Sequence, residues 1–150
     1  MEEKSLVLIK PENECIALDA IDYLDENLKG DFSRTMLMQI YRVPERLIRE
    51  HCRNIKHLPC YENTVQAFLR ESIFLTCYTG EGIISRVRFI AGPTDPIVAK
   101  RDFPESIRAQ FTNDSLEAAA REGRYLNNVI HASRNPEESR EDRYLWREFL

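Results

Sequence analysis

The chain has 150 residues, a length that predicts one domain spanning residues 1–150 with a buried hydrophobic core. Hydrophobic residues make up 43% and charged residues 31%, which is typical of a globular chain and excludes a disordered one. The formal net charge of −4 argues against a nucleic acid partner. Any phosphate site therefore has to be a local cluster of Lys and Arg.

The sequence carries no sign of a membrane or export segment. Its hydrophobic runs, such as Leu6–Ile9 and Ile73–Leu75, are far too short to span a bilayer, and no hydrophobic leader opens the chain. The four cysteines lack C-x-x-C spacing, and only three histidines are present. We therefore expect a cytoplasmic protein with reduced thiols, no membrane partner and no protein-bound metal site.

Hydropathy patterns predict two strands and a helix in the first 43 residues. Ser5–Lys10 is a nearly continuous hydrophobic run, typical of a central strand covered on both faces. Asn13 is a candidate helix cap, and hydrophobic residues follow it at helical spacing until Gly30. Met36–Val43 then alternates as a strand does.

Three helices, a strand and a loop are predicted next. Pro44 suits the first turn of a short helix, and a second helical pattern follows Pro59. Ile73–Thr79 is a β-rich run, and Ile83–Ala91 returns to helical spacing before a Gly-Pro pair. Residues 93–113 contain three prolines and no clear period, which indicates a long functional loop.

The last part of the chain predicts a helix, a strand and a C-terminal helix. Asp114 and Glu117 have the spacing of a capping box, and Gly123 is a stop signal for the helix that follows. Asn128–His131 is a short strand candidate, and Asn135 begins the second start signal. The resulting order is β-α-β-α-α-β-α-loop-α-β-α.

Four strands interleaved with helices indicate an α/β (α+β) domain. We predict one mixed sheet with helices packed on it, and a ferredoxin-like four-stranded sheet is the favoured arrangement.

His131 ends the segment N-N-V-I-H-A-S and is the candidate reactive residue. Sequence context alone leaves two interpretations open. His131 is either an ordinary packed or surface histidine, or a nucleophile that accepts a phosphoryl group. Lys10, Arg88 and Arg108 stand at element ends or in the loop, where such cations neutralise phosphate charge. Each is also typical of a solvated surface, so the set suggests a phosphate site without establishing one.

Five segments closely resemble motifs of the nucleoside diphosphate kinases, in the same order. They are L-V-L-I-K-P-E, G-P-T-D-P, S-I-R-A-Q-F, N-N-V-I-H-A-S and N-P-E-E-S. The resemblance covers most of the chain, from Leu6 to Phe149. It implies a phosphotransferase that moves the γ-phosphoryl group of a nucleoside triphosphate to a diphosphate. The implied mechanism is ping-pong, through a phosphohistidine on His131.

The same resemblance implies roles for individual residues. It makes His131 the nucleophile, assisted by Lys10, by Ser133 and by a carboxylate that orients the imidazole. Glu141 and Asp142 both lie near the required position, and Asp142 is favoured because it needs no gap after His131. The implied nucleotide-binding residues are Lys10, Cys60, Arg88, Thr94, Arg108 and Asn128.

Two cysteines and one insertion depart from the family pattern. Cys52 stands where the family has a tyrosine that braces the active histidine, and Cys60 where a phenylalanine stacks on the base. The 22 residues between Arg108 and His131 exceed the usual family spacing, and the surplus includes Asp114–Arg124. We therefore expect altered base stacking and a changed surface near the nucleotide or between subunits.

The resemblance further implies Mg²⁺ bound through the nucleotide phosphates, nucleoside tri- and diphosphates as ligands, and a homo-oligomer (hexamer, tetramer or dimer). The alternative function is a non-catalytic nucleotide-binding or scaffold relative. Retention of the full set of implied site residues favours activity, whereas the two cysteines favour weakened turnover or an altered nucleotide preference.

Overall fold

One antiparallel sheet forms the centre of the computed structural model, which describes residues Met1–Leu150. Its strands are β1 (Glu2–Ile9), β2 (Ser33–Arg34), β3 (Met38–Ile40), β4 (Ile73–Glu81) and β5 (Ile130–Ala132). β1 lies between β4 and β5, and both β2 and β3 pair with the outer edge of β4. With β2 and β3 sharing one position, the sheet has the four-position order of a ferredoxin-like domain.

The predicted α+β fold class is therefore confirmed, but the mixed sheet is wrong. Every neighbouring pair is antiparallel. The helical connections join strands that are not neighbours: β4 separates β1 from β2 and β3, and β1 separates β4 from β5. Each intervening strand runs in the opposite direction.

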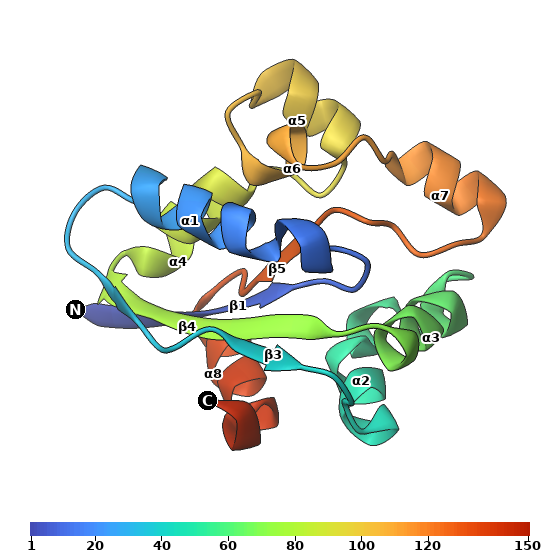
Figure 1. Cartoon of the computed structure of the whole chain (residues 1–150), viewed down its shortest axis with the longest axis horizontal. Helices are drawn as coiled ribbons and strands as arrows, with labels where there is room; N and C mark the ends of the chain where they lie inside the picture. The colour runs from blue at the N-terminus through green and yellow to red at the C-terminus, as the bar shows by residue number, and fades with distance from the viewer.

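Eight helices flank the sheet (Figure 1). They are α1 (Ala17–Asn27), α2 (Glu45–His51), α3 (Tyr61–Arg70), α4 (Ile83–Ala91), α5 (Pro96–Asp102), α6 (Ile107–Gln110), α7 (Leu116–Glu122) and α8 (Pro136–Leu145), with 3-10 turns at Glu14–Ile16, Arg53–Ile55 and Arg147–Phe149. The predicted helices after Pro44, Pro59 and Asn135 are confirmed, the last with the Asn135 side chain accepting from the backbone N–H of Glu138. No helix is long and apolar enough to cross a bilayer.

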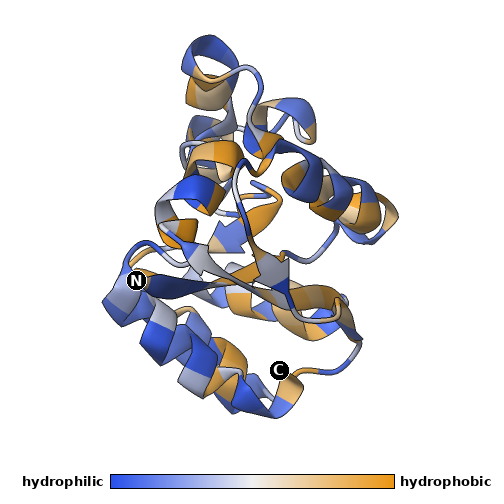
Figure 2. Ribbon diagram, turned by 90° about the vertical axis from the view of Figure 1, so that its left-hand side faces the viewer, coloured by the Kyte–Doolittle hydropathy of each residue, from blue (hydrophilic) through white to orange (hydrophobic).

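β1 separates two hydrophobic cores, as its continuous hydrophobic run predicts. Val7 and Ile9 face the core shared with α1 and α4, whereas Leu6 and Leu8 face the core that holds α2, α3 and Trp146. All four β1 side chains are fully buried. α1 and α4 lie on one side of the sheet and α2 and α8 on the other (Figure 1), and hydrophobic residues line the helices beside the sheet (Figure 2).

The predicted strand Met36–Val43 is broken into two short pieces. Thr35 interrupts the ladder because its hydroxyl accepts the backbone N–H of Cys77 at 3.0 Å. Met36 lies in the break and is exposed, and only Ile40 and Val43 of this series are buried. β2 and β3 form a sheet edge with solvent on its open side, so the hydropathy pattern overstated the length of regular pairing.

Residues 93–113 were expected to be a loop, and that prediction is wrong. The segment forms α5 and α6. Asp95 caps α5 by accepting from the backbone N–H of Ile97, and Ser106 caps α6 by accepting from that of Ala109. α5 has seven residues and α6 has four, so neither exceeds about two turns. Helices this short do not show a hydrophobic periodicity in the sequence.

Two predicted caps are also corrected. Ser115, rather than Asp114, caps α7 by accepting from the backbone N–H of Ala118. Asp114 instead forms an ion pair with Arg124 at 2.7 Å. Asn13 makes no capping bond, because its side-chain amide donates to the backbone carbonyls of the turn after β1.

Candidate active site

His131 lies at the centre of β5 and faces the core that holds α2 and α8. Its β1 partner is Leu8, so the two side chains project from the same face of the sheet. The flanking Ile130 and Ala132 point to the opposite face and are buried there. The short strand thus presents the imidazole, with 21% of the side chain exposed, into a cleft.

A carboxylate holds one nitrogen of this ring. His131 Nε2 lies 3.0 Å from Asp142 Oδ2, which also accepts from the Ser133 hydroxyl at 3.0 Å. An ionised carboxylate only accepts, so the Nε2 proton is directed at Asp142. The other ring nitrogen, Nδ1, makes no hydrogen bond within the protein.

Asp142, and not Glu141, is the orienting carboxylate. Burial alone raises the pKa of Asp142, but its hydrogen bond with His131 and the charge of that ring outweigh burial, so the pKa lies below its ordinary value. Glu141 is not part of the cleft lining and forms an ion pair with Arg53 at 2.7 Å. The alternative that the sequence left open is resolved by geometry.

The ring of His51, held by Trp146, packs against the ring of His131. The ring of His51 meets that of His131 edge-on at 4.8 Å between centroids, and Trp146 Nε1 donates to His51 Nδ1 at 3.2 Å. Burial, followed by the charge of His131, lowers the pKa of His51 to about 3. His51 is therefore neutral at physiological pH, and neither it nor Trp146 was among the predicted site residues.

The trio His51, His131 and Asp142 has potential ligand atoms within 4.8 Å of one another. It does not fit a metal ion well. Because the Trp146 N–H occupies Nδ1 of the neutral His51 ring, its remaining proton sits on Nε2 and leaves no free lone pair.

The cleft in front of His131 has a volume of about 270 Å³. It brings together seven predicted residues: Lys10, Arg88, Thr94, Arg108, Asn128, His131 and Asp142. Ser133 lies behind Asp142, outside the lining. Cys60 is also outside the lining and occupies the N-cap position of α3.

Cations dominate this cleft although the whole chain is negative. The lining contains Lys10, Arg53, Arg88, Arg108 and Arg134 but only two carboxylates, Glu138 and Asp142. Glu138 is paired with Arg134 at 3.0 Å and Asp142 with His131. Burial and the nearby Arg108 lower the pKa of Lys10 to about 7. The site therefore has an excess of positive charge and no free carboxylate.

Arg108 holds the backbone that leads into β5. Its guanidinium donates to the carbonyls of Asn128, Gly92 and Ile130 at 3.2, 2.7 and 2.6 Å. Between Asn128 and Ile130 lies Val129, whose φ of +71° is strained for a β-branched residue. Arg108 thus stabilises a kink one residue before the strand that carries His131.

Asn128 presents an unpaired acceptor to the cleft. Its side-chain nitrogen donates to the carbonyl of Thr94 at 2.9 Å, while its buried Oδ1 has no hydrogen-bond partner. A buried acceptor without a donor costs free energy, so this oxygen is suited to a ligand hydroxyl or N–H.

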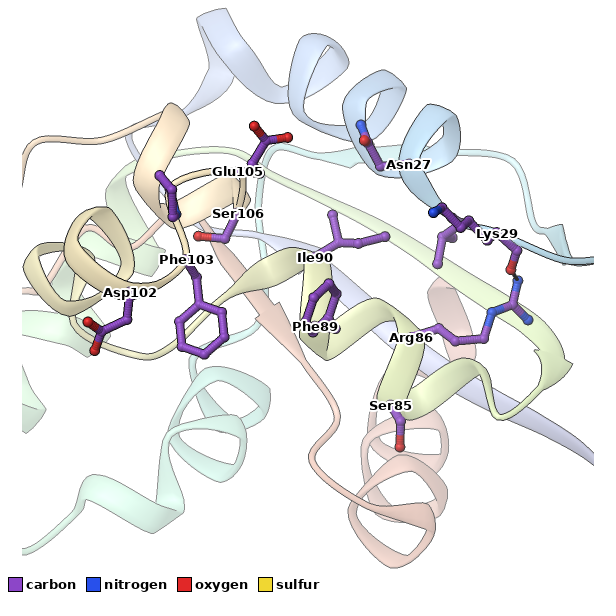
Figure 3. Close-up of a pocket in the computed structure, with 12 residues that line it drawn as sticks. Asn27, Lys29, Ser85, Arg86, Phe89, Ile90, Asp102, Phe103, Glu105 and Ser106 are labelled. Atoms are coloured by element: carbon purple, nitrogen blue, oxygen red, sulfur yellow. Dashed lines mark hydrogen bonds between the residues drawn. The ribbon is translucent and has the colours of Figure 1, made fainter.

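A larger cavity of about 870 Å³ lies elsewhere, between the end of α1, α4 and the α5–α6 connection. Figure 3 shows its lining, in which the rings of Phe89 and Phe103 lie near Ile90. It contains none of the predicted site residues, and no histidine lies in its lining.

The fold agrees with the comparisons with known proteins. A family model described as nucleoside diphosphate kinase matches residues 3–148, and the chain belongs to that family. It is 32% identical over 136 residues to a nucleoside diphosphate kinase of Aquifex aeolicus, covering 90% of this chain and 87% of the relative.

Solved structures show the same fold. A crystal form of the Aquifex aeolicus nucleoside diphosphate kinase has a TM-score of 0.78 at 26% identity, covering 97% of this chain and 94% of that one. The kinase of Borrelia burgdorferi, solved as a transition state mimic with bound vanadate and ADP, has a TM-score of 0.82 at 23% identity, covering 97% and 86%.

Proposed function

We propose that this protein is an active nucleoside diphosphate kinase. The observation that carries the proposal is the pairing of His131 Nε2 with Asp142, which leaves Nδ1 free at the floor of a cationic cleft. The Nδ1 lone pair attacks the γ-phosphorus of a nucleoside triphosphate. The bond from that phosphorus to its bridging oxygen breaks, and the diphosphate leaves. A second diphosphate then takes the group from His131.

The neighbouring residues have distinct roles in this proposal. Asp142, held by Ser133, stabilises the positive charge that develops on the imidazole during attack. Lys10 and Arg88 neutralise the phosphates, and Thr94 binds them through its exposed hydroxyl group. Asn128 Oδ1 accepts from a sugar hydroxyl.

Arg108 binds both the protein backbone and the phosphate. Three of its five N–H donors serve backbone carbonyls, and the remaining donors are available for a phosphate oxygen. Cys60 takes the position next to the base, where a thiol gives no aromatic stacking.

Magnesium fits this site only through the nucleotide. Mg²⁺ prefers oxygen ligands, and the two cleft carboxylates are already engaged by His131, Ser133 and Arg134. The ion would be held by the phosphates and would neutralise their charge. We further propose that residues 1–150 act as one domain and that the protein assembles as a homo-oligomer.

The test is formation of a phosphohistidine. The protein is incubated with γ-labelled ATP and Mg²⁺, and acid-labile label is measured on the wild type, on His131→Ala and on the matched control His57→Ala. His57 is exposed and lies outside the cleft. We expect label on the wild type and the control, its loss in His131→Ala, and its transfer to added GDP. An unlabelled wild type would favour the non-catalytic nucleotide-binding relative.

A further inference from the structure

Lys10 carries a half-buried ammonium group without an anionic partner. It lies at the end of β1, and no carboxylate is within 4 Å of its Nζ. The groups that face it are Arg108 from α6, the thiols of Cys52 and Cys60, and the ring of Tyr125. Arg108 repels it, and the Cys52 thiol, whose pKa burial raises to about 11, is neutral at physiological pH. Another feature has to keep this side chain charged and in place.

The ring of Tyr125 lies under the Lys10 ammonium. Lys10 Nζ is 5.9 Å from the ring centroid, within the range of a cation–π interaction. Tyr125 is only 7% exposed, and water therefore screens the contact little. Its hydroxyl donates to the carbonyl of Pro11 at 3.4 Å, which ties the ring to the same turn that carries Lys10.

The ring of Tyr125 is positioned by the segment 114–127, which includes α7. Asp114 binds Arg124 at 2.7 Å and accepts from the backbone N–H of Asn127 at 2.9 Å, which closes the segment on itself. The Asn63 side chain donates to the carbonyl of Gly123, and this anchors the segment to α3. Asn127 Oδ1 accepts from the Asn13 side chain at 2.8 Å, which fixes the segment to the turn after β1. Tyr125 is therefore held from both sides.

We propose that Tyr125 is a positioning residue, which holds the charged Lys10 side chain in the active-site cleft through the face of its ring. The surplus segment between Arg108 and His131 would then act in phosphate binding through Lys10, without touching the nucleotide. This role rests on the proposed kinase function, but the contact itself can be tested without catalysis.

The direct test is an NMR titration of the lysine ¹³Cε resonances, since the chain contains only five lysines and Lys10→Arg identifies the relevant signal. Loss of the ring face destabilises the ammonium form. In Tyr125→Leu we therefore expect the Lys10 midpoint to fall by roughly half a pH unit to one unit. Tyr125→Phe keeps the aromatic ring face, so its Lys10 midpoint should stay close to that of the wild type. Tyr144→Leu, at an exposed tyrosine outside the cleft, is the control.

The kinetic consequence has the same direction. If Lys10 titrates near pH 7, such a shift lowers its charged fraction at pH 7 about two- to fivefold, and kcat/KM for the nucleotide should fall equally. The loss of kcat/KM should be smaller at pH 6, where a larger fraction of Lys10 is protonated. A purely structural defect would persist at both pH values.

A ring-trifluorinated phenylalanine at position 125 keeps the shape of the ring but removes the negative electrostatic potential of its face. It therefore tests the proposal even if Tyr125→Leu folds poorly. We expect it to titrate like Tyr125→Leu. An unchanged Lys10 midpoint in this variant overturns the proposal, as does a Tyr125→Phe midpoint that falls as far as that of Tyr125→Leu. Phosphohistidine formation on the wild type is measured in parallel, so a failure of the kinase function is seen separately.

Discussion

The two histidines of the cleft have the same side chain and opposite roles. His131 has one nitrogen on a carboxylate and the other free toward the cleft. His51 accepts the Trp146 N–H and packs against His131, and this desolvation keeps the ring neutral. A neutral second ring is needed there, because two adjacent imidazolium ions would repel each other. His51 thus supports the ring of His131 at a cost in acid stability.

That cost predicts the pH dependence of folding. The ordinary pKa of His51 is 6.5 and the folded value is about 3, so between these values the unfolded chain binds a proton that the folded protein does not. The free energy of unfolding should therefore fall as the pH falls below 6.5, by at most about 1.4 kcal/mol per pH unit from this residue.

Urea unfolding at pH 7, 6 and 5 measures this slope. His51→Phe keeps a ring but cannot protonate, so its stability should depend less on pH than that of the wild type over this range. His57→Phe, at an exposed position, should keep the wild-type slope. Equal slopes in wild type and His51→Phe would contradict the assignment.

At the scale of elements, short caps and turns decide how the cleft is built. Gly92 ends α4 with a φ of +89°, and its carbonyl accepts from Arg108 Nη1 at 2.7 Å. A Cβ atom at this position would lie 2.5 Å from Ser106 Oγ, the cap of α6. The close approach of α4 and α6 at this glycine brings Arg108 to the backbone before His131.

Two glycine substitutions distinguish backbone strain at a positive φ from steric overlap between α4 and α6. Gly82 also has a positive φ, +58°, but nothing lies within 4 Å of a Cβ there. Gly82→Ala should cost about 1 kcal/mol of stability from backbone strain alone. Gly92→Ala should cost about 3 kcal/mol or more, since overpacking adds to strain. Thermal or urea unfolding measures both variants, and equal losses would show that α4 and α6 are not closely packed.

At the scale of the whole molecule, charge is distributed unevenly. The chain carries a formal net charge of −4, yet five of its Lys and Arg side chains line one cleft with two carboxylates. Cations concentrated in a cleft attract polyanionic ligands more strongly than the net charge suggests. The remainder of the surface carries a net negative charge.

Salt should therefore weaken nucleotide capture. Between 50 and 500 mM NaCl we expect kcat/KM to fall about three- to tenfold, mainly through KM. Arg134→Gln, at the cleft, should reduce this dependence. The matched control Arg101→Gln removes an exposed arginine paired with Asp102, away from the cleft, and should not. A salt dependence that is the same in all three proteins would contradict a role for the local cluster.

Much of the fold and several site residues followed from the sequence because their signals are local. The hydrophobic run of β1 predicted burial on both faces, and the Asn135 cap and the Gly123 stop are confirmed. His131 lies in a motif of the family, and Asp142 was favoured from its spacing after His131. Where local signals were weak or ambiguous the predictions failed, as with the very short helices α5 and α6 and the broken edge strand at Thr35.

Only the tertiary structure decided the contacts between distant segments. Glu141 and Asp142 are adjacent in sequence, but on a helix their side chains point about 100° apart, so the packing of α8 on β1 selects Asp142. The bond from Trp146 to His51 spans 95 residues, and the contact of Lys10 with Tyr125 joins the first strand to the segment after α7. No spacing rule connects such residues, because they meet only when both cores close around β1.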